Sequence, residues 1–375
     1  MTGPDPFAPL DPFDPLALGV EEEVLAGLVA RLAEADGPAD EAGVWPAALW
    51  QALVEAGASR WPIPEEFGGL GLDRPSMVLR YVLVAEGSLT AAFILTQQDA
   101  AIRRLVAAAG THDRARDWLW QIADGRAFST VGLSQLTTSL RRGPQALRAS
   151  EIGEGAYRLD GAMPWVSAAD RADVIVTGGV LDDGRQVLIA LPGDRAGVSI
   201  GEPMPLAALQ ASCTTEVVCE GVEVRPEEVL FGPDPDVLKL ASGGGGAGGL
   251  ETSALAVGQS RAALRALRQL SFQRDELTEP AEALEAAWQG VTSALLAAAE
   301  GRPDAPDPAE IRRRSHDLAL RTSQAYLTAR QGTGFLRPEP AQRYARQALF
   351  FLVWSCPGPV AQAALRDFAG LCPDF

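Results

Sequence analysis

Apolar residues recur at helical spacing through most of the first 125 residues. Between positions 20 and 36, for example, Val20, Val24, Leu28 and Leu32 fall on one face of a helix. The first 18 residues differ, because prolines at positions 4, 6, 9, 12 and 15 forbid a helix and predict an extended arm. The pattern after this arm predicts helices at 20–36, 46–56, 76–86, 88–109 and 112–123.

The periodicity changes at Phe128. From there to about Phe231, short runs rich in β-branched residues are separated by turn signals such as the Asp-Asp-Gly at 182–184. In one run, Thr215, Val217 and Cys219 alternate with more polar positions, as in a strand with one wet face. This region is predicted to be all β.

Helical spacing returns after the glycine-rich stretch 243–249, which is expected to be a hinge between domains. The fold class is therefore a multidomain α+β protein, with an N-terminal all-α domain, a middle β barrel or sandwich, and a C-terminal four-helix bundle. The expected domains are the arm 1–18, then 19–125, 126–240 and 241–375. The C-terminal helices are predicted at 250–272, 281–300, 308–331, 340–354 and 358–370.

Charge and composition exclude several functions. The 375 residues include 32 Lys and Arg against 49 Asp and Glu, a net charge of −17 that argues against nucleic-acid binding. Four cysteines lack the CxxC spacing of a zinc ribbon, and His112 and His316 are expected on helix surfaces, so no metal site is predicted. No apolar run is long enough to span a membrane, and no signal peptide is evident, which predicts a soluble, cytoplasmic protein without membrane insertion.

Several strings, in this order along the chain, are similar to motifs of one family. Trp61–Gly71 (WPIPEEFGGLG) resembles a P-x-x-x-G-G-x-G loop, and Asp160–Ser167 (DGAMPWVS) resembles a D/N-G-x-K-x-W-I-T/S turn. Gln331–Phe335 (QGTGF) takes the place of G-G-x-G-F/Y, and Arg346–Ala348 that of R-D-A. The chain is thus identified as resembling the acyl-CoA dehydrogenase family of flavoproteins, from about residue 20 to 370.

The resemblance implies an enzyme that oxidises an acyl thioester to its α,β-unsaturated form. A carboxylate takes the α-proton, and N5 of FAD takes the β-hydride. Trp165 would pack against the flavin, although its alternative role is that of a core aromatic in the β domain. The residues that the resemblance places around the cofactor are Leu133, Ser134, Ser139, Trp165, Val166, Ser167, Arg274, Gln331 and Gly332.

The chain departs from the family pattern in two flavin-binding segments. Where the family has T-E-P-x-x-G-S-D, residues 134–141 read SQLTTSLR, which leaves Ser139 as a hydroxyl for the pyrophosphate. Where the family has R-x-x-F-G, which touches the FAD of a neighbouring subunit, only Arg274 remains. Because these residues are missing, the sequence leaves open whether the chain still binds FAD.

The catalytic base of most family members is missing, because no acidic residue occurs from Pro340 to Arg366. A minority of the family carries the base at the start of the first bundle helix, where this chain has Glu251. The alternative is that Glu251 only complements the dipole of that helix.

Three functions stay open. The first is an acyl-CoA dehydrogenase-like flavoprotein with Glu251 as base. The second is a flavin-dependent monooxygenase on the same fold, which needs no α-proton base, and the third is a non-catalytic member of the family. The resemblance also implies a homodimer or homotetramer, an acyl thioester as small-molecule substrate, and an electron-transfer flavoprotein as a candidate partner.

Overall fold

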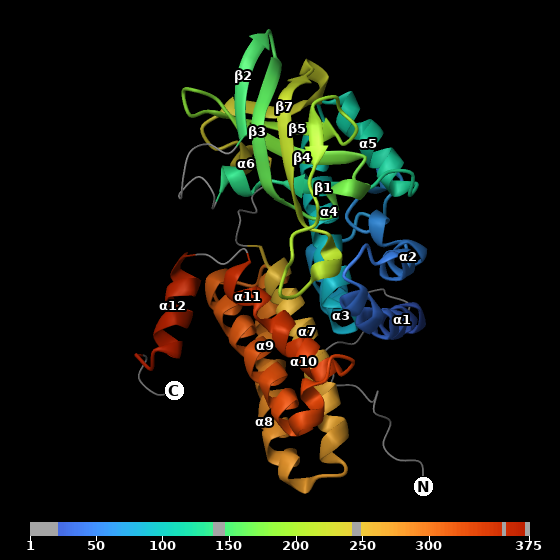
Figure 1. Ribbon diagram of the computed structural model, residues 1–375, viewed down its shortest axis with the longest axis vertical. Helices are drawn as coiled ribbons and strands as arrows, with labels where there is room; N and C mark the ends of the chain where they lie inside the picture. The colour runs from blue at the N-terminus through green and yellow to red at the C-terminus, as the bar shows by residue number, and fades with distance from the viewer. Residues whose placement is uncertain (1–21, 138–146, 242–248, 355–357, 372–375) are drawn as a thin grey trace.

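The computed structural model describes residues 22–137, 147–241, 249–354 and 358–371. Figure 1 shows the strands at one end of an elongated molecule, the long C-terminal helices at the other, and the N-terminal helices packed along one side. This arrangement confirms the predicted order of helices, a β layer and a helical bundle. The arm 1–18 and most of the hinge 243–249 lie outside the described residues, so both stay predictions, as do the domain boundaries.

The N-terminal helices agree with the hydrophobic periodicity. Asp73 begins one of them by accepting a hydrogen bond from the backbone N–H of Ser76, and Ser88 begins the next by accepting one from Ala91. Helix α4 is buried along most of its length, which explains why its sequence is apolar on more than one face. The bounds are α1 Glu22–Ala42, α2 Ala47–Glu55, α3 Arg74–Gly87, α4 Leu89–Ala108 and α5 Asp113–Ala123.

The strands form a single eight-stranded sheet in the order β6-β7-β3-β2-β4-β5-β8, with β1 paired in parallel to β4. The Asp-Asp-Gly turn joins the antiparallel pair β4 and β5, as predicted. Buried and exposed positions alternate along β7, which confirms its one wet face. The bounds are β1 Ser129–Gly132, β2 Leu147–Gly153, β3 Ala156–Val166, β4 Val174–Val180, β5 Gln186–Pro192, β6 Val198–Ile200, β7 Thr215–Val224 and β8 Val229–Asp234.

Three long helices of the C-terminal part lie side by side, and α7 also packs against α3 and α4. Gly258 in α7 permits this close approach, because a Cβ there would lie 2.2 Å from the carbonyl oxygen of Val82 in α3. The helix predicted over 340–354 is interrupted at Leu349. The bounds are α6 Val237–Leu240, α7 Glu251–Ser271, α8 Thr278–Ala299, α9 Pro308–Arg330, α10 Pro340–Ala348, α11 Phe350–Val353 and α12 Gly358–Phe368.

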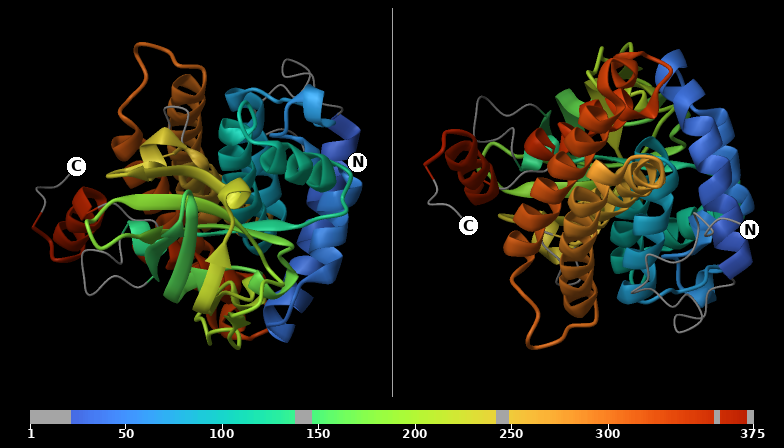
Figure 2. Two further views of the ribbon diagram at one scale, coloured as in Figure 1. Left: turned by 90° about the horizontal axis from the view of Figure 1, so that it is seen from above. Right: turned by 90° about the horizontal axis from the view of Figure 1, so that it is seen from below.

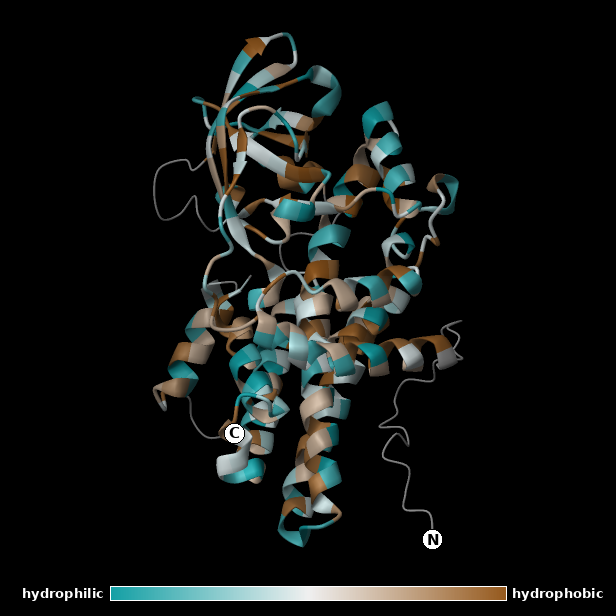
Figure 3. Ribbon diagram, turned by 45° about the vertical axis from the view of Figure 1, so that its right-hand side comes forward, coloured by the Kyte–Doolittle hydropathy of each residue, from teal (hydrophilic) through white to brown (hydrophobic). Residues whose placement is uncertain are grey.

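Figure 2 shows α1 and α12 on opposite sides of the molecule, with the bundle between them. In Figure 3, hydrophobic and hydrophilic residues alternate along most helices and strands, as expected of elements that each bury one face. One continuous hydrophobic core joins α1, α3 and α4 to the bundle helices α7, α8 and α9. The N-terminal helices and the bundle are therefore held together by burial of apolar surface.

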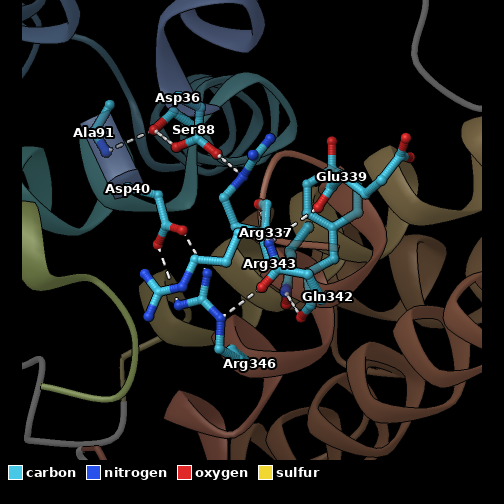
Figure 4. Close-up of polar contacts among 11 residues, drawn as sticks. Asp36, Asp40, Ser88, Ala91, Arg337, Glu339, Gln342, Arg343 and Arg346 are labelled. Atoms are coloured by element: carbon cyan, nitrogen blue, oxygen red, sulfur yellow. Dashed lines mark hydrogen bonds and ion pairs between the residues drawn. The ribbon is translucent and has the colours of Figure 1, made fainter. Parts of the chain in front are cut away.

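Helix α1 continues past Asp36, where the sequence pattern predicted its end, and includes Pro38. Polar contacts with distant helices account for the extension (Figure 4). Asp36 accepts a hydrogen bond from the Ser88 hydroxyl at 2.5 Å and pairs with Arg343 of α10 at 2.8 Å, while Asp40 pairs with Arg346. Burial raises the pKa of Asp36, and Arg343 and Ser88 act in the opposite direction.

The prediction that His316 lies on a helix surface is wrong. Its side chain is 4% exposed on α9 and lies against Phe351, with ring centroids 5.3 Å apart. Burial, with a smaller contribution from the positive charge of Arg312, lowers the pKa of His316 to about 3. The charged neighbours in sequence were misleading, because this face of α9 is covered by α11. His112 is half-buried and precedes α5.

Candidate active site

Leu133 and Ser134 follow β1, where the chain turns out of the strand into a short 3-10 helix at 134–136. Both residues are half-buried. The Oγ atom of Ser134 is buried, and no hydrogen-bond partner for it occurs among the described residues. A buried hydroxyl without a partner costs about 1–3 kcal/mol, so Ser134 offers an unused polar group at this turn.

Trp165, Val166 and Ser167 lie at the end of β3. The side chain of Trp165 is 41% exposed, which excludes the alternative that it is a core aromatic, whereas Val166 is buried inside the sheet layer. The Ser167 hydroxyl is also buried and lies 2.8 Å from the Thr214 hydroxyl. Their contacts with a flavin stay predictions.

Aromatic rings from three parts of the chain meet at Trp165. The ring of Trp354, which directly follows α11, lies edge-on to Trp165 with centroids 6.2 Å apart. Trp354 in turn contacts Phe93 of α4 at 4.9 Å and Phe350 of α11 at 5.7 Å. We call Phe93, Trp165, Phe350 and Trp354 the aromatic group. Phe350 and Trp354 belong to the C-terminal segment 340–366, which contains no acidic residue.

Glu251 is the first residue of α7, and its side chain is 30% exposed. Its Oε1 lies 3.4 Å from Nη1 of Arg103 in α4, so the two form an ion pair between the N-terminal helices and the bundle. Gly249 makes room for this carboxylate, because a Cβ at position 249 would lie 1.8 Å from Oε2 of Glu251. Arg312 fixes the same turn by donating to the carbonyl oxygen of Gly249 at 2.7 Å.

A second carboxylate, Asp99, lies on the same helix as Arg103. Its Oδ2 accepts a hydrogen bond from the Tyr81 hydroxyl of α3 at 2.7 Å, and its side chain is fully buried. Burial raises the pKa of Asp99 to about 7, against the lowering effects of the Tyr81 hydrogen bond and the Arg103 charge. We call Tyr81, Asp99, Arg103 and Glu251 the polar cluster.

Arg274, Gln331 and Gly332 lie together at the opposite end of the bundle. Arg274 donates to the carbonyl oxygen of Ala329 at 2.6 Å and to Glu276 at 2.8 Å, while Gln331 and Gly332 are exposed beyond the end of α9. Because α7 has 21 residues, Glu251 and Arg274 are separated by about 30 Å along it. Within one chain, these three residues therefore cannot contact a ligand that Glu251 contacts.

The structure thus places the predicted site residues in three separate groups, and Ser139 lies outside the described residues. Sequence reasoning missed Phe93, Tyr81, Asp99 and Arg103. One signal was present, namely a charged Asp99 inside the apolar run of α4 with an arginine four residues later. Tyr81 carries no comparable signal, because a tyrosine in an apolar helix is common in any core.

The residues at the ends of β1 and β3 fit the ring of a flavin. Trp165 presents a partly exposed aromatic ring, and Ser134 presents a buried hydroxyl without a partner in the part of the chain that is described. The segment expected near the pyrophosphate, residues 134–141, is described only as far as Thr137. Arg274 already donates to two oxygens, so its geometry does not by itself indicate a phosphate contact.

Comparison with known proteins adds independent evidence. Residues 20–126 match the family model described as acyl-CoA dehydrogenase, N-terminal domain. The probable acyl-CoA dehydrogenase YngJ of Bacillus subtilis is 26% identical over 332 residues, which cover 82% of this chain and 86% of that protein. The N-terminal helices thus match the acyl-CoA dehydrogenase family, and the chain as a whole is similar to its members.

Its divergence within the family is considerable. The structure of butyryl-CoA dehydrogenase from Megasphaera elsdenii superposes with a TM-score of 0.80 at 20% identity, covering 92% of this chain and 97% of that one. The dibenzothiophene monooxygenase of Rhodococcus erythropolis is 27% identical over 234 residues, or 60% of this chain and 53% of that protein. The chain is therefore similar both to acyl-CoA dehydrogenases and to a monooxygenase.

Known members of the acyl-CoA dehydrogenase family are flavoproteins, and one related monooxygenase structure is described as FMN-bound. Among the residues described here, no helix is both long and apolar enough to cross a membrane. The fold is thus shown, together with the similarity to acyl-CoA dehydrogenases, while the reaction of this chain needs its own argument.

Proposed function

We propose that this chain is a flavin-dependent oxidoreductase that converts an acyl thioester to its α,β-unsaturated form, with Glu251 as the proton acceptor. The observation that carries the proposal is the position of Glu251, a partly exposed carboxylate where α4 and α7 meet. The C-terminal segment 340–366, where most family members carry a base, contains no acidic residue. Instead of an acid, this segment carries aromatic residues that include Phe350 and Trp354.

In this proposal, each side chain has a defined task. Glu251 accepts the proton from the α-carbon, and Arg103 holds its carboxylate in place beforehand. Trp165 and Ser134 bind the cofactor ring, for which FAD is the candidate. A bound flavin would supply the electron acceptor for the hydride of the β-carbon, which protein side chains cannot supply.

The experiment that tests this function compares the wild type with Glu251→Gln. Glutamine keeps the shape of the side chain but cannot take a proton, and loss of a general base reduces rates by about 10²–10⁴-fold. Turnover of acyl thioesters should fall by that factor while circular dichroism and flavin content stay unchanged. Turnover equal to that of the wild type would rule out Glu251 as base.

A second function, flavin-dependent oxygenation, is favoured by a specific observation. The carboxylate of Glu251 is already paired with the guanidinium of Arg103, and a relative of this chain is named a dibenzothiophene monooxygenase. An oxygenase would consume oxygen when supplied with reduced flavin and a substrate, and Glu251→Gln would leave that rate unchanged. Oxygen uptake measured in both proteins separates the two functions.

We further propose that the domains are 19–125, 126–240 and 241–375, and that the chain assembles into a homodimer or homotetramer through its bundle. The distance of about 30 Å between Glu251 and Arg274 supports the second point, since Arg274, Gln331 and Gly332 would then serve the cofactor of a neighbouring subunit. An electron-transfer flavoprotein is the candidate acceptor of the electrons. Sedimentation velocity gives the assembly state directly.

A further inference from the structure

Asp99 is a buried acid that the proposed reaction does not use. It lies in the middle of α4 with no exposed surface, between apolar residues that include Leu95 and Ile102. Its Oδ2 is bonded to the Tyr81 hydroxyl, and its Oδ1 is buried with no hydrogen-bond partner among the described residues. A carboxylate in such a place is costly unless it is protonated or has a counter-ion.

The counter-ion is shared with Glu251. Asp99 and Arg103 are four residues apart on α4 and therefore lie on the same face of the helix, one turn from each other. Arg103 also pairs with Glu251 at 3.4 Å. Helices α3, α4 and α7 meet here (Figure 1), and the groups that face Asp99 are Tyr81 from α3, Arg103 from α4 and Glu251 from α7.

One guanidinium can balance only one of the two carboxylates. When Asp99 is protonated, the charge of Arg103 is balanced by Glu251 alone. When Asp99 is ionised, it competes with Glu251 for the same guanidinium. The two negatively charged carboxylates then repel each other.

We infer that Tyr81, Asp99 and Arg103 are positioning residues for Glu251, and that the negative charge on Asp99 frees the Glu251 carboxylate from Arg103 so that it can accept a proton. This inference rests on the proposed function, because it assumes that Glu251 is the base. The coupling between the two carboxylates through Arg103 can be tested whether or not the chain turns over a thioester.

The pKa of Asp99 is raised to about 7, so the ionisation of its carboxyl falls in a pH range that can be measured. Infrared spectroscopy of the purified full-length protein detects the C=O stretch of a protonated carboxyl group, and this signal should disappear near neutral pH. Asp99→Asn should lack the transition, which identifies it. Asp117→Asn, which removes an exposed carboxylate on α5, is the matched control and should retain the transition.

Coupling is tested by the remaining variants. Glu251→Gln should move the transition of Asp99 to lower pH, because the negative charge of Glu251 raises the pKa of Asp99. Tyr81→Phe should move it to higher pH, because the lost hydrogen bond stabilised the ionised form. If Glu251→Gln leaves the transition in place, or if Asp99→Asn retains it, the inference is overturned.

Turnover provides the functional readout. In the wild type, kcat/KM should rise with the ionisation of Asp99, and Tyr81→Phe should move this rise to higher pH. Asp99→Asn, which is always neutral, should lack the rise and remain slower than the wild type above pH 8. A Glu251→Gln enzyme with unchanged turnover would refute the proposed function, whereas the infrared result decides the coupling independently.

Discussion

The free energy of unfolding of this protein should depend on pH through Asp99. The substitution Asp99→Asn should remove this contribution. The pKa of the Asp99 carboxyl is raised from 3.8 to about 7 by burial. Between these values, the folded protein holds a proton that the unfolded chain has released. Stability contributed by this proton is complete below the unfolded pKa and is lost as the pH rises through the folded pKa, so the free energy of unfolding should fall with rising pH.

The magnitude follows from proton linkage. One proton contributes about 1.4 kcal/mol per pH unit where the folded state holds it and the unfolded state does not. Between pH 4.5 and 6.5, the slope decreases as the folded state begins to ionise, which leaves a loss of roughly 2 kcal/mol attributable to Asp99. Asp99→Asn cannot titrate and still accepts the Tyr81 hydrogen bond through its amide oxygen.

The assay is urea unfolding at a series of pH values, followed by tryptophan fluorescence. The quantity of interest is the difference in unfolding free energy between the wild type and Asp99→Asn, because titrating groups that do not interact with Asp99 cancel in it. Between pH 4.5 and 6.5, this difference should change by roughly 2 kcal/mol, because the wild type loses stability as the pH rises and Asp99→Asn does not. Asp117→Asn serves as control and should run parallel to the wild type. Parallel curves for Asp99→Asn as well would refute the reasoning.

Three further predictions concern other parts of the molecule. Gly249→Ala should displace the Glu251 carboxylate, because the new Cβ would lie 1.8 Å from its Oε2. This variant should reduce turnover at little cost in stability. The control Gly290→Ala in α8 should stabilise the protein by about 0.5–1 kcal/mol in thermal unfolding. Arg343→Met should destabilise by about 3–5 kcal/mol in urea unfolding, since it leaves Asp36 charged and buried, and the double variant with Asp36→Asn should recover part of that loss. Trp165→Ala should weaken flavin affinity in a fluorescence titration yet change stability by less than about 1 kcal/mol, because Trp165 is 41% exposed.

The sequence alone predicted most helices and strands, because each buries one face and the spacing of apolar residues records that face. The sequence pattern gave wrong predictions where contacts with residues far away in the sequence determine the structure. Helix α1 passes through Pro38 because Asp36 and Asp40 pair with Arg343 and Arg346, about 300 residues away, and no local pattern shows such contacts. For the same reason, the burial of His316 depends on which face of α9 the bundle covers.

The candidate site shows the same division. Glu251 and Trp165 could be predicted because they lie in strings that resemble family motifs. The residues that decide their environment come from helices with no such motif: Arg103, Asp99 and Tyr81 around Glu251, and Phe93 next to the aromatic rings. Only the packing of α3, α4 and α7 brings the polar cluster together.

The most direct test of the central claim is anaerobic reduction of the flavin by substrate. Protein loaded with FAD would be mixed with a panel of acyl thioesters of different chain length, and the visible absorbance of the oxidised flavin would be followed. We predict that at least one thioester bleaches the flavin in the wild type and that Glu251→Gln abolishes this bleaching. A wild type that binds FAD but is bleached by none of them, or a Glu251→Gln variant bleached at the wild-type rate, would contradict the account.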